Sequence, residues 1–288
     1  MKSHAWMLAA LLAASFPALG EEQEETFVDL VPGQEMLDPA RLAPLIRQGD
    51  VRAMNNIGLL WAKGFQGKQS YEEALRWWKE AARRGYTVAM NNVGLAYANG
   101  HGVERDMQKA FEWWHQAAFL GNAWAMNAVG DCYEKGEGVE QDDRMAMTWY
   151  QSAAQYGEAM AMYNIGALFE HGKGIPRDYH EAISWYRKSA QKGDASAMRA
   201  IGRFYRQGLG VNIDPLEAWA WHSVAAARFR AEEADEAALN RRELEQLTAQ
   251  LSAEQRTQAR VRAEQIDLAT RPAASATGAP QQPGEQRI

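Results

Sequence analysis

Gly85–Tyr97, with the sequence GYTVAMNNVGLAY, decides the fold of this 288-residue chain because its pattern recurs every 36 residues. Its Ala-Met pair starts at Ala53, Ala89, Ala125, Ala161 and Ala197. A glycine stands four residues after each methionine, at Gly58, Gly94, Gly130, Gly166 and Gly202. An aromatic residue stands three residues after each glycine, at Trp61, Tyr97, Tyr133, Phe169 and Tyr205. Five copies without an insertion predict a repeat array.

Each copy divides into two predicted helices. The first, helix A, covers Asp50–Lys63 in the first copy, because its apolar positions recur at spacings of three and four. Every helix A ends at a glycine, which can take the left-handed conformation that stops a helix: Gly64, Gly100, Gly136, Gly172 and Gly208. The second, helix B, starts on a capping residue: Ser70, Asp106, Asp142, Asp178 and Asp214. Each helix B then carries a tryptophan: Trp77, Trp113, Trp149, Trp185 and Trp221.

Two glycine patterns set the packing of the repeats. A glycine inside helix A, such as Gly94, costs about 1 kcal/mol relative to alanine, so we expect a neighbouring helix or a bulky aromatic ring to approach it closely. The turn between the helices reads Gly-x-Gly-Val or Gly-x-Gly-Ile in four copies. The first copy departs from it, with Gln66 at the second glycine.

The combined pattern resembles the Sel-one-like repeat, a relative of the tetratricopeptide repeat. It reads Ala-x-x-x-Leu-Gly-x-x-Tyr, then Gly-x-Gly-Val, then Asp-x-x-x-Ala-x-x-Trp-Tyr-x-x-Ala-Ala, and it covers residues 49–228. The resemblance implies an all-α fold, an α/α superhelical solenoid of five 36-residue helix-turn-helix repeats with helix A on the concave side. It also implies an adaptor rather than a particular activity.

The segments outside the repeats have their own predicted roles. Residues 1–20 have the pattern of a signal peptide, with an apolar run and small residues that predict cleavage after Gly20; an N-terminal membrane anchor is the alternative. Residues 21–36 are an acidic, flexible lead-in, and residues 37–48 predict an N-terminal capping helix. Residues 229–270 predict a C-terminal helical cap with Leu239, Leu244 and Leu247 as an apolar stripe. Residues 271–288 predict a disordered tail.

The composition argues against several classes of function. A net charge of −6 without a basic cluster disfavours nucleic-acid binding. The chain has no catalytic motif, no paired metal ligands and no phosphate loop, since its Gly-x-Gly segments follow helices. Its one cysteine, Cys132, stands at a core position and cannot form an internal disulfide. We therefore predict no enzymatic activity, no cofactor and no metal site.

The positions of helix A that vary between copies predict a binding site. They fall at the third, sixth, tenth and thirteenth residues after the leading glycine, which is one stripe of a helix. We call it the A-helix stripe. Its predicted partner-binding residues are Asn55, Leu59, Asn91, Leu95, Trp124, Asn127, Asp131, Glu134, Met160, Tyr163, Glu170, Arg199, Arg203 and Arg206. Leu59, Leu95, Trp124 and Met160 would be exposed without purpose on an ordinary solvated face.

The charge of the stripe changes along the chain. Arg199, Arg203 and Arg206 share one helix face, and as unpaired cations they would attract an acidic partner. Alternatively, Glu134 or Glu170 pairs with Arg203 and the cluster is structural.

These observations predict an exported, periplasmic scaffold that holds a protein segment or domain in its groove, with no membrane-spanning segment in the mature protein and no nucleic-acid partner. One alternative is an immunity or inhibitor protein against a secreted toxin or an envelope enzyme. Another is a periplasmic regulator of a signalling receptor. The least favoured is an enzyme acting on cell-wall material, for which Asp131, Glu134 and Glu170 are the candidate carboxylates.

Overall fold

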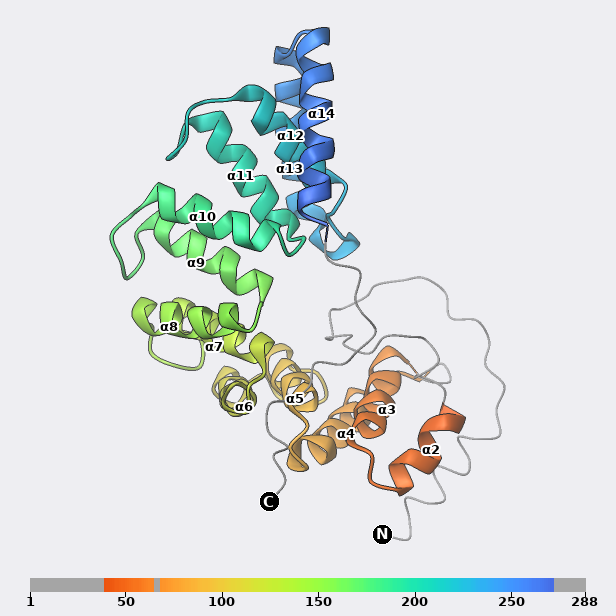
Figure 1. Cartoon of the computed structure of the whole chain (residues 1–288). Coiled ribbons are helices and arrows are strands. Elements are labelled where there is room, and N and C mark those ends of the chain that lie inside the picture. The colour runs from red at the N-terminus through yellow and green to blue at the C-terminus, as the bar shows by residue number, and fades with distance from the viewer. Residues whose placement is uncertain (1–38, 65–67, 272–288) are drawn as a thin grey trace, which may run out of the picture. The chain divides into compact units, whose positions relative to one another are not determined.

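The computed structural model describes residues 39–64 and 68–271, and this part of the chain is built from helices and turns without strands (Figure 1). The helices are α2 (Pro39–Arg47), α3 (Val51–Lys63), α4 (Tyr71–Arg83), α5 (Thr87–Asn99), α6 (Met107–Phe119), α7 (Ala123–Lys135), α8 (Asp143–Gln155), α9 (Ala159–His171), α10 (Tyr179–Ala190), α11 (Ala195–Gln207), α12 (Pro215–Ala226), the short 3₁₀ helix η3 (Ala231–Glu233), α13 (Ala234–Gln250) and α14 (Ala253–Ala269). Helix A of each repeat is α3, α5, α7, α9 or α11, and helix B is the helix that follows it. The predicted all-α solenoid of five helix pairs is therefore confirmed.

The chain forms two compact units, with the boundary inside α9. The first, the N-terminal unit, extends to Ala161 and includes Lys173–Ile175. In it α2 packs on α3, and α3 to α7 pack consecutively, each on the next, as α7 does on α8. The second, the C-terminal unit, contains Met162–Gly172 and the chain from Pro176 onward. In it α10 packs on α11, α11 on α12, and α12 on both α13 and α14.

The ends of the helices follow the predicted chemistry. Gly64 and Gly208 end their helices in the left-handed conformation, with φ of 91° and 73°. At the start of each helix B, the predicted capping side chain accepts hydrogen bonds from backbone N–H groups: Ser70, Asp106, Asp142, Asp178 and Asp214. These bonds satisfy donors that the first helical turn leaves unpaired.

A buried ring on helix B explains the glycine inside each helix A. A Cβ atom at Gly94 would lie 2.2 Å from Nε1 of Trp114, and one at Gly130 would lie 2.5 Å from Cε1 of Tyr150. The same contact is made in the other repeats by Gly58 with Trp78, Gly166 with Tyr186 and Gly202 with His222. The predicted close approach is confirmed. The ring comes from the residue after each tryptophan named above, and it is the more deeply buried of the two.

The second glycine of each turn packs on the preceding repeat. A Cβ atom at Gly138 would lie 2.2 Å from the carbonyl oxygen of Met107 in α6, and one at Gly102 would lie 2.5 Å from the backbone of Tyr71 in α4. Gly174 and Gly210 make equivalent contacts with α8 and α10. The first repeat has no helix B before it, which explains why its sequence can carry Gln66 at this position.

Helices flank the repeats at both ends. In α2, Leu42 and Ile46 are buried, and α2 contains Pro44. Ser252 caps α14 in a capping box with Gln255. In α13, however, Leu239 is 48% exposed and Leu247 is buried, so the predicted apolar stripe is wrong at Leu239. The predictions for residues 1–20, for the lead-in at 21–36 and for the tail beyond Arg271 lie outside the described residues.

No helix in the described ranges is both long and apolar enough to cross a membrane.

Candidate protein-binding face

The A-helix stripe is only partly accessible. Asn55, Leu59, Asn91, Asn127 and Glu170 are buried, whereas Met160 is 46% exposed. The remaining predicted residues are half-buried: Leu95, Trp124, Asp131, Glu134, Tyr163, Arg199, Arg203 and Arg206.

The expectation that Leu59 is exposed is wrong, because its side chain is 1% exposed. Residues 53–59 of α3 are all buried. Neighbouring A helices also contact each other along this face, since Asn92 Nδ2 donates to Asn55 Oδ1 at 2.8 Å. Part of the stripe therefore belongs to the interior.

In repeats 1 and 2 the ring under the glycine bonds to the helix backbone. Trp78 Nε1 donates to the carbonyl oxygen of Asn55 at 3.2 Å, and Trp114 Nε1 donates to that of Asn91 at 3.3 Å. An indole has one donor and no acceptor, so these bonds satisfy its polar group. The stripe side chains of these two repeats carry no charge apart from Arg52.

In repeat 3 the ring is a tyrosine that reaches two carboxyl groups of the stripe. Tyr150 Oη lies 2.6 Å from Asp131 Oδ1 and 2.8 Å from Glu134 Oε2, and Lys173 Nζ lies 2.7 Å from Glu134 Oε1. A phenol carries one proton and donates to only one of the two. Burial raises the pKa of Asp131, although the hydrogen bond from Tyr150 opposes this shift. The carboxyl groups are thus engaged with side chains of their own unit.

Repeat 4 uses the same arrangement with an arginine. Tyr186 Oη donates to Glu170 Oε2 at 2.7 Å, and Arg203 of α11 bonds both oxygens of the same carboxylate, each at 2.7 Å. Burial opposes ionisation of Glu170, but the bonds from Arg203 and Tyr186 outweigh it and lower its pKa. The alternative that pairs Arg203 with Glu170 is therefore correct.

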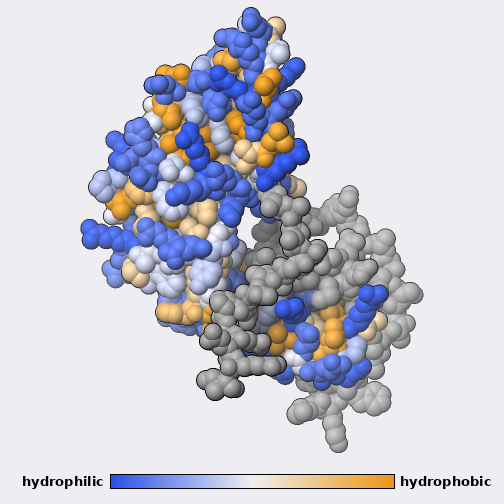
Figure 2. Space-filling view, in the orientation of Figure 1, coloured by the Kyte–Doolittle hydropathy of each residue, from blue (hydrophilic) through white to orange (hydrophobic). Residues whose placement is uncertain are grey.

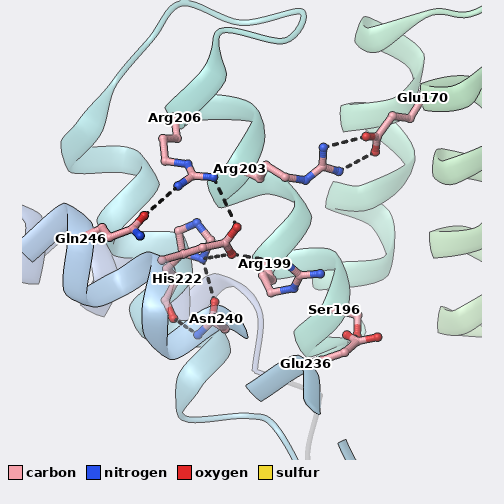
Figure 3. Close-up of polar contacts among 10 residues, drawn as sticks. Glu170, Ser196, Arg199, Arg203, Arg206, His222, Glu236, Asn240 and Gln246 are labelled. Carbon is pink, nitrogen blue, oxygen red and sulfur yellow. Dashed lines mark hydrogen bonds and ion pairs between the residues drawn. The ribbon is translucent and has the colours of Figure 1, made fainter. Parts of the chain in front are cut away.

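Helix α13 covers the other two arginines of the stripe (Figure 3). Glu243 accepts from Arg199 at 3.3 Å and from Arg206 at 3.4 Å, and Arg206 also contacts Gln246. Ser196 Oγ donates to Glu236. The expectation of three unpaired cations is wrong, because Glu243 of α13 pairs with Arg199 and Arg206, and Glu170 of α9 pairs with Arg203.

His222 takes the place of the ring in repeat 5. It is fully buried, and its Nδ1 lies 2.7 Å from Asn240 Oδ1, while Asn240 Nδ2 donates to the His222 carbonyl oxygen at 2.9 Å. Burial lowers the pKa of His222, so the neutral ring is favoured and its Nδ1 donates to Asn240. The residues after the conserved tryptophans were the signal that sequence reasoning missed: they change from Trp to Tyr to His as the stripe becomes charged.

The cysteine of this chain, Cys132, has a structural role. Cys132 is buried, and burial raises the pKa of its thiol to about 12, so it is a core residue as predicted. Within residues 39–64 and 68–271, no three His, Cys, Asp or Glu side chains are grouped so as to hold a metal ion.

Comparisons with solved structures give relatives of the same kind. A crystal structure of a Sel1 repeat protein from Oxalobacter formigenes is 30% identical, with a TM-score of 0.60, over 67% of this chain and 79% of that one. The structure of c5321, a protective antigen of uropathogenic Escherichia coli with an SLR fold, is 27% identical, with a TM-score of 0.65, over 81% of this chain. The match spans 49% of that antigen. The immunity protein Pa5087 from Pseudomonas aeruginosa is 18% identical over 81% of this chain and 89% of its own, with a TM-score of 0.48, a likeness too distant to indicate function.

A comparison with curated proteins gave no match. The profile of the Sel1 repeat, the Sel-one-like repeat of the sequence analysis, matches residues 51–86, 87–122, 125–157, 159–194 and 195–228, more than half of the chain. Sel1 repeats generally form non-catalytic scaffolds for protein interactions. Because the profile matches more than half of its residues, the chain belongs to the Sel1 repeat family.

Proposed function

We propose that this chain is an exported, non-enzymatic scaffold that binds a protein partner through the A-helix stripe of its N-terminal unit. The observation that carries the proposal is Trp124, a half-buried indole at the start of α7. Its ring meets that of Trp114 edge to face, with 6.0 Å between their centres. A tryptophan held in this way presents a large apolar surface that loses little freedom when a partner covers it.

Other apolar side chains lie on the same stripe of the same unit. Leu95 is half-buried, and Met160 is 46% exposed. Tryptophan is enriched among the residues that contribute most to protein interfaces, and methionine adapts to irregular partners. The apolar part of the stripe is thus the better candidate, since the charged side chains already have partners within the chain itself.

The carboxyl groups that could support an enzyme have other partners. Glu134 contacts Tyr150 and Lys173, and Glu170 contacts Tyr186 and Arg203. A general acid or base needs a reacting group within hydrogen-bond distance, and these oxygens are occupied. Their arrangement supports a structural role.

The proposed export depends on residues 1–20. Cleavage after Gly20 would give a mature protein that begins at Glu21. Intact-mass measurement of protein from the periplasm tests this step, and a retained Met1 would contradict it.

Affinity capture with matched variants tests the binding face. The mature protein and two variants, Trp124→Ala and Trp77→Ala, are immobilised and exposed to an envelope extract, and the bound proteins are compared by mass spectrometry. Trp77 is a matched control because it is also half-buried but lies on helix B, under the guanidinium of Arg76. We expect one protein to be captured by the wild type and by Trp77→Ala and to be reduced about 30-fold by Trp124→Ala, since loss of a central interface tryptophan removes about 2 kcal/mol or more. Equal capture by all three would contradict the proposed face.

A further inference from the structure

A small pocket of about 360 Å³ lies on the C-terminal unit, and none of its lining residues belongs to the A-helix stripe. It is formed by residues of α10 and of the turn that follows α11. The turn comes close because Gly210 has no side chain: a Cβ atom there would lie 2.8 Å from the backbone of Tyr179. In Figure 2, hydrophilic side chains with apolar ones between them cover the face of the C-terminal unit that is in view.

The pocket combines an apolar wall with a cationic rim. Ile183, which is 4% exposed, and Val211 supply apolar surface. Arg187 and Lys188 are exposed at its rim, and Ser184 adds a hydroxyl group. The charged and titratable side chains of the lining are His180, Arg187 and Lys188, and no Asp or Glu is among them.

The two cations of the rim lack a carboxylate partner within the described part of the chain. Arg187 donates from Nη2 to the phenol oxygen of Tyr205 at 2.7 Å, which leaves its other N–H groups for a ligand. Lys188 Nζ lies 3.5 Å from the ring centre of Trp185. Glu181 is on the same helix but does not line the pocket. Two adjacent cations that have no counter-ion and stand beside an apolar wall can bond the carboxylate of an amphipathic ligand.

The first repeat provides an internal comparison. Lys79 stands at the position of Arg187, and it donates to Tyr97 at 2.9 Å, so repeats 1 and 4 share the contact between a cation and a phenol. At the positions of His180 and Lys188, however, the first repeat has Glu72 and Glu80. Repeat 3 has the neutral pair Gln151 and Ser152 in place of the two cations, repeat 2 has His115 and Gln116, and repeat 5 has Ser223 and Val224. The cationic pair without nearby acids is specific to repeat 4.

We infer that this pocket binds a carboxylate that is attached to a small apolar group. The guanidinium of Arg187 and the ammonium of Lys188 bond the carboxylate, and Ile183 and Val211 contact the apolar group. The volume is at the lower end of the range of about 300–1,000 Å³ for ligand pockets, so it accommodates one or two residues of a peptide. Such a group is either the C-terminal residue of a peptide or an internal acidic residue beside an apolar one. The inference is independent of the proposed binding face, which lies on helix A of the other unit.

Three dansylated peptides distinguish these sources: Gly-Ala-Leu with a free C-terminus, the same peptide with a C-terminal amide, and amidated Gly-Glu-Leu. Binding to the mature protein is followed by fluorescence anisotropy at low and at high salt. We expect the first or the third peptide to bind at least about tenfold more tightly than the neutral amide, with an affinity that falls as salt is added. Tighter binding of Gly-Ala-Leu with a free C-terminus than of its amide identifies a peptide C-terminus as the ligand. Tighter binding of amidated Gly-Glu-Leu than of amidated Gly-Ala-Leu identifies an acidic side chain as the ligand. Equal binding of all three peptides, or no binding by any of them, would overturn the inference.

Variants locate the site. Arg187→Gln with Lys188→Gln removes the cations and should weaken binding of the anionic peptide at least about tenfold. Ser184→Glu keeps both Arg187 and Tyr205, places a carboxylate beside the cations and should have the same effect. Lys192→Gln is the control, because Lys192 is exposed just after α10 and does not line the pocket; it should change the affinity less than about twofold. Unchanged affinity in Ser184→Glu, with helicity and melting temperature as in the wild type, would contradict this location.

Discussion

Repeats 1 and 2 differ from repeats 3 and 4 in one buried ring, and the difference extends to the A-helix stripe. Trp78 and Trp114 donate their one N–H group to backbone carbonyl oxygens, so they need no hydrogen-bond acceptor among the stripe side chains. Tyr150 and Tyr186 are one ring smaller, and their hydroxyl groups reach carboxyl groups of the stripe. Each glutamate bound in this way also binds a cation from farther along the chain. The choice of one core residue thus separates repeats with a neutral stripe from repeats with an ionic one.

The largest effect is expected where a side chain is forced against the buried ring. Gly130→Leu should lower the free energy of unfolding by about 3 kcal/mol or more, because even a Cβ atom would lie 2.5 Å from the Tyr150 ring. Chemical denaturation measures the loss. Gly130→Ala should be partly rescued by Tyr150→Ala, which removes the ring. If the double variant is no more stable than expected from the two single changes, the ring is not the cause.

A medium effect should separate the two kinds of stripe. Arg203→Met removes the cation from the buried Glu170 and should destabilise the C-terminal unit by about 2 kcal/mol, below the value for a fully buried pair since Arg203 is partly exposed. Leu95→Met, at the same position of repeat 2, changes shape without removing a charge partner and should have less than about 1 kcal/mol effect. Thermal and denaturant unfolding of both variants measure these two losses of stability. Equal losses would contradict the expected difference between the ionic and the neutral part of the stripe.

The smallest expected effect depends on pH and concerns the caps of helix A. Asp194 caps α11, and burial raises its pKa to about 6, whereas Asn122 caps α7 at the equivalent position and does not titrate. A raised pKa in the folded state means that the contribution of Asp194 is greatest below about pH 3.8 and is lost as the pH rises through about 6. Asp194→Asn keeps an oxygen for the backbone N–H of Ala197 and should stabilise the protein by about 1 kcal/mol at pH 8.

Unfolding curves between pH 4.5 and pH 8 test this expectation. The difference between Asp194→Asn and the wild type should shrink as the pH falls, because the buried aspartate then becomes protonated. A variant that is less stable than the wild type at pH 8 would contradict the account.

The sequence was sufficient for the repeats because their signals are local and occur five times. The capping aspartates and the glycines that end helix A act within a few residues of their position, so each copy supports the others. The partners of the stripe could not be predicted in the same way. Glu243 pairs with Arg199 and Arg206 from a helix that has no counterpart in the repeats, and no periodicity fixes its position. Burial of Leu59 likewise depends on how closely helices approach, which the spacing of residues does not specify.

The second glycine of each turn gives the array a direction of growth by duplication. This glycine lies against the helix B that comes earlier in the chain, at Gly102, Gly138, Gly174 and Gly210. A duplicated inner repeat therefore already carries the glycine that lets its turn pack on the repeat before it. A copy of the first repeat inserted farther along would instead bring Gln66 to a place where even a Cβ atom lies within 3 Å of another backbone. Duplication of inner repeats can therefore lengthen the array without new mutations, whereas the first repeat is confined to the start.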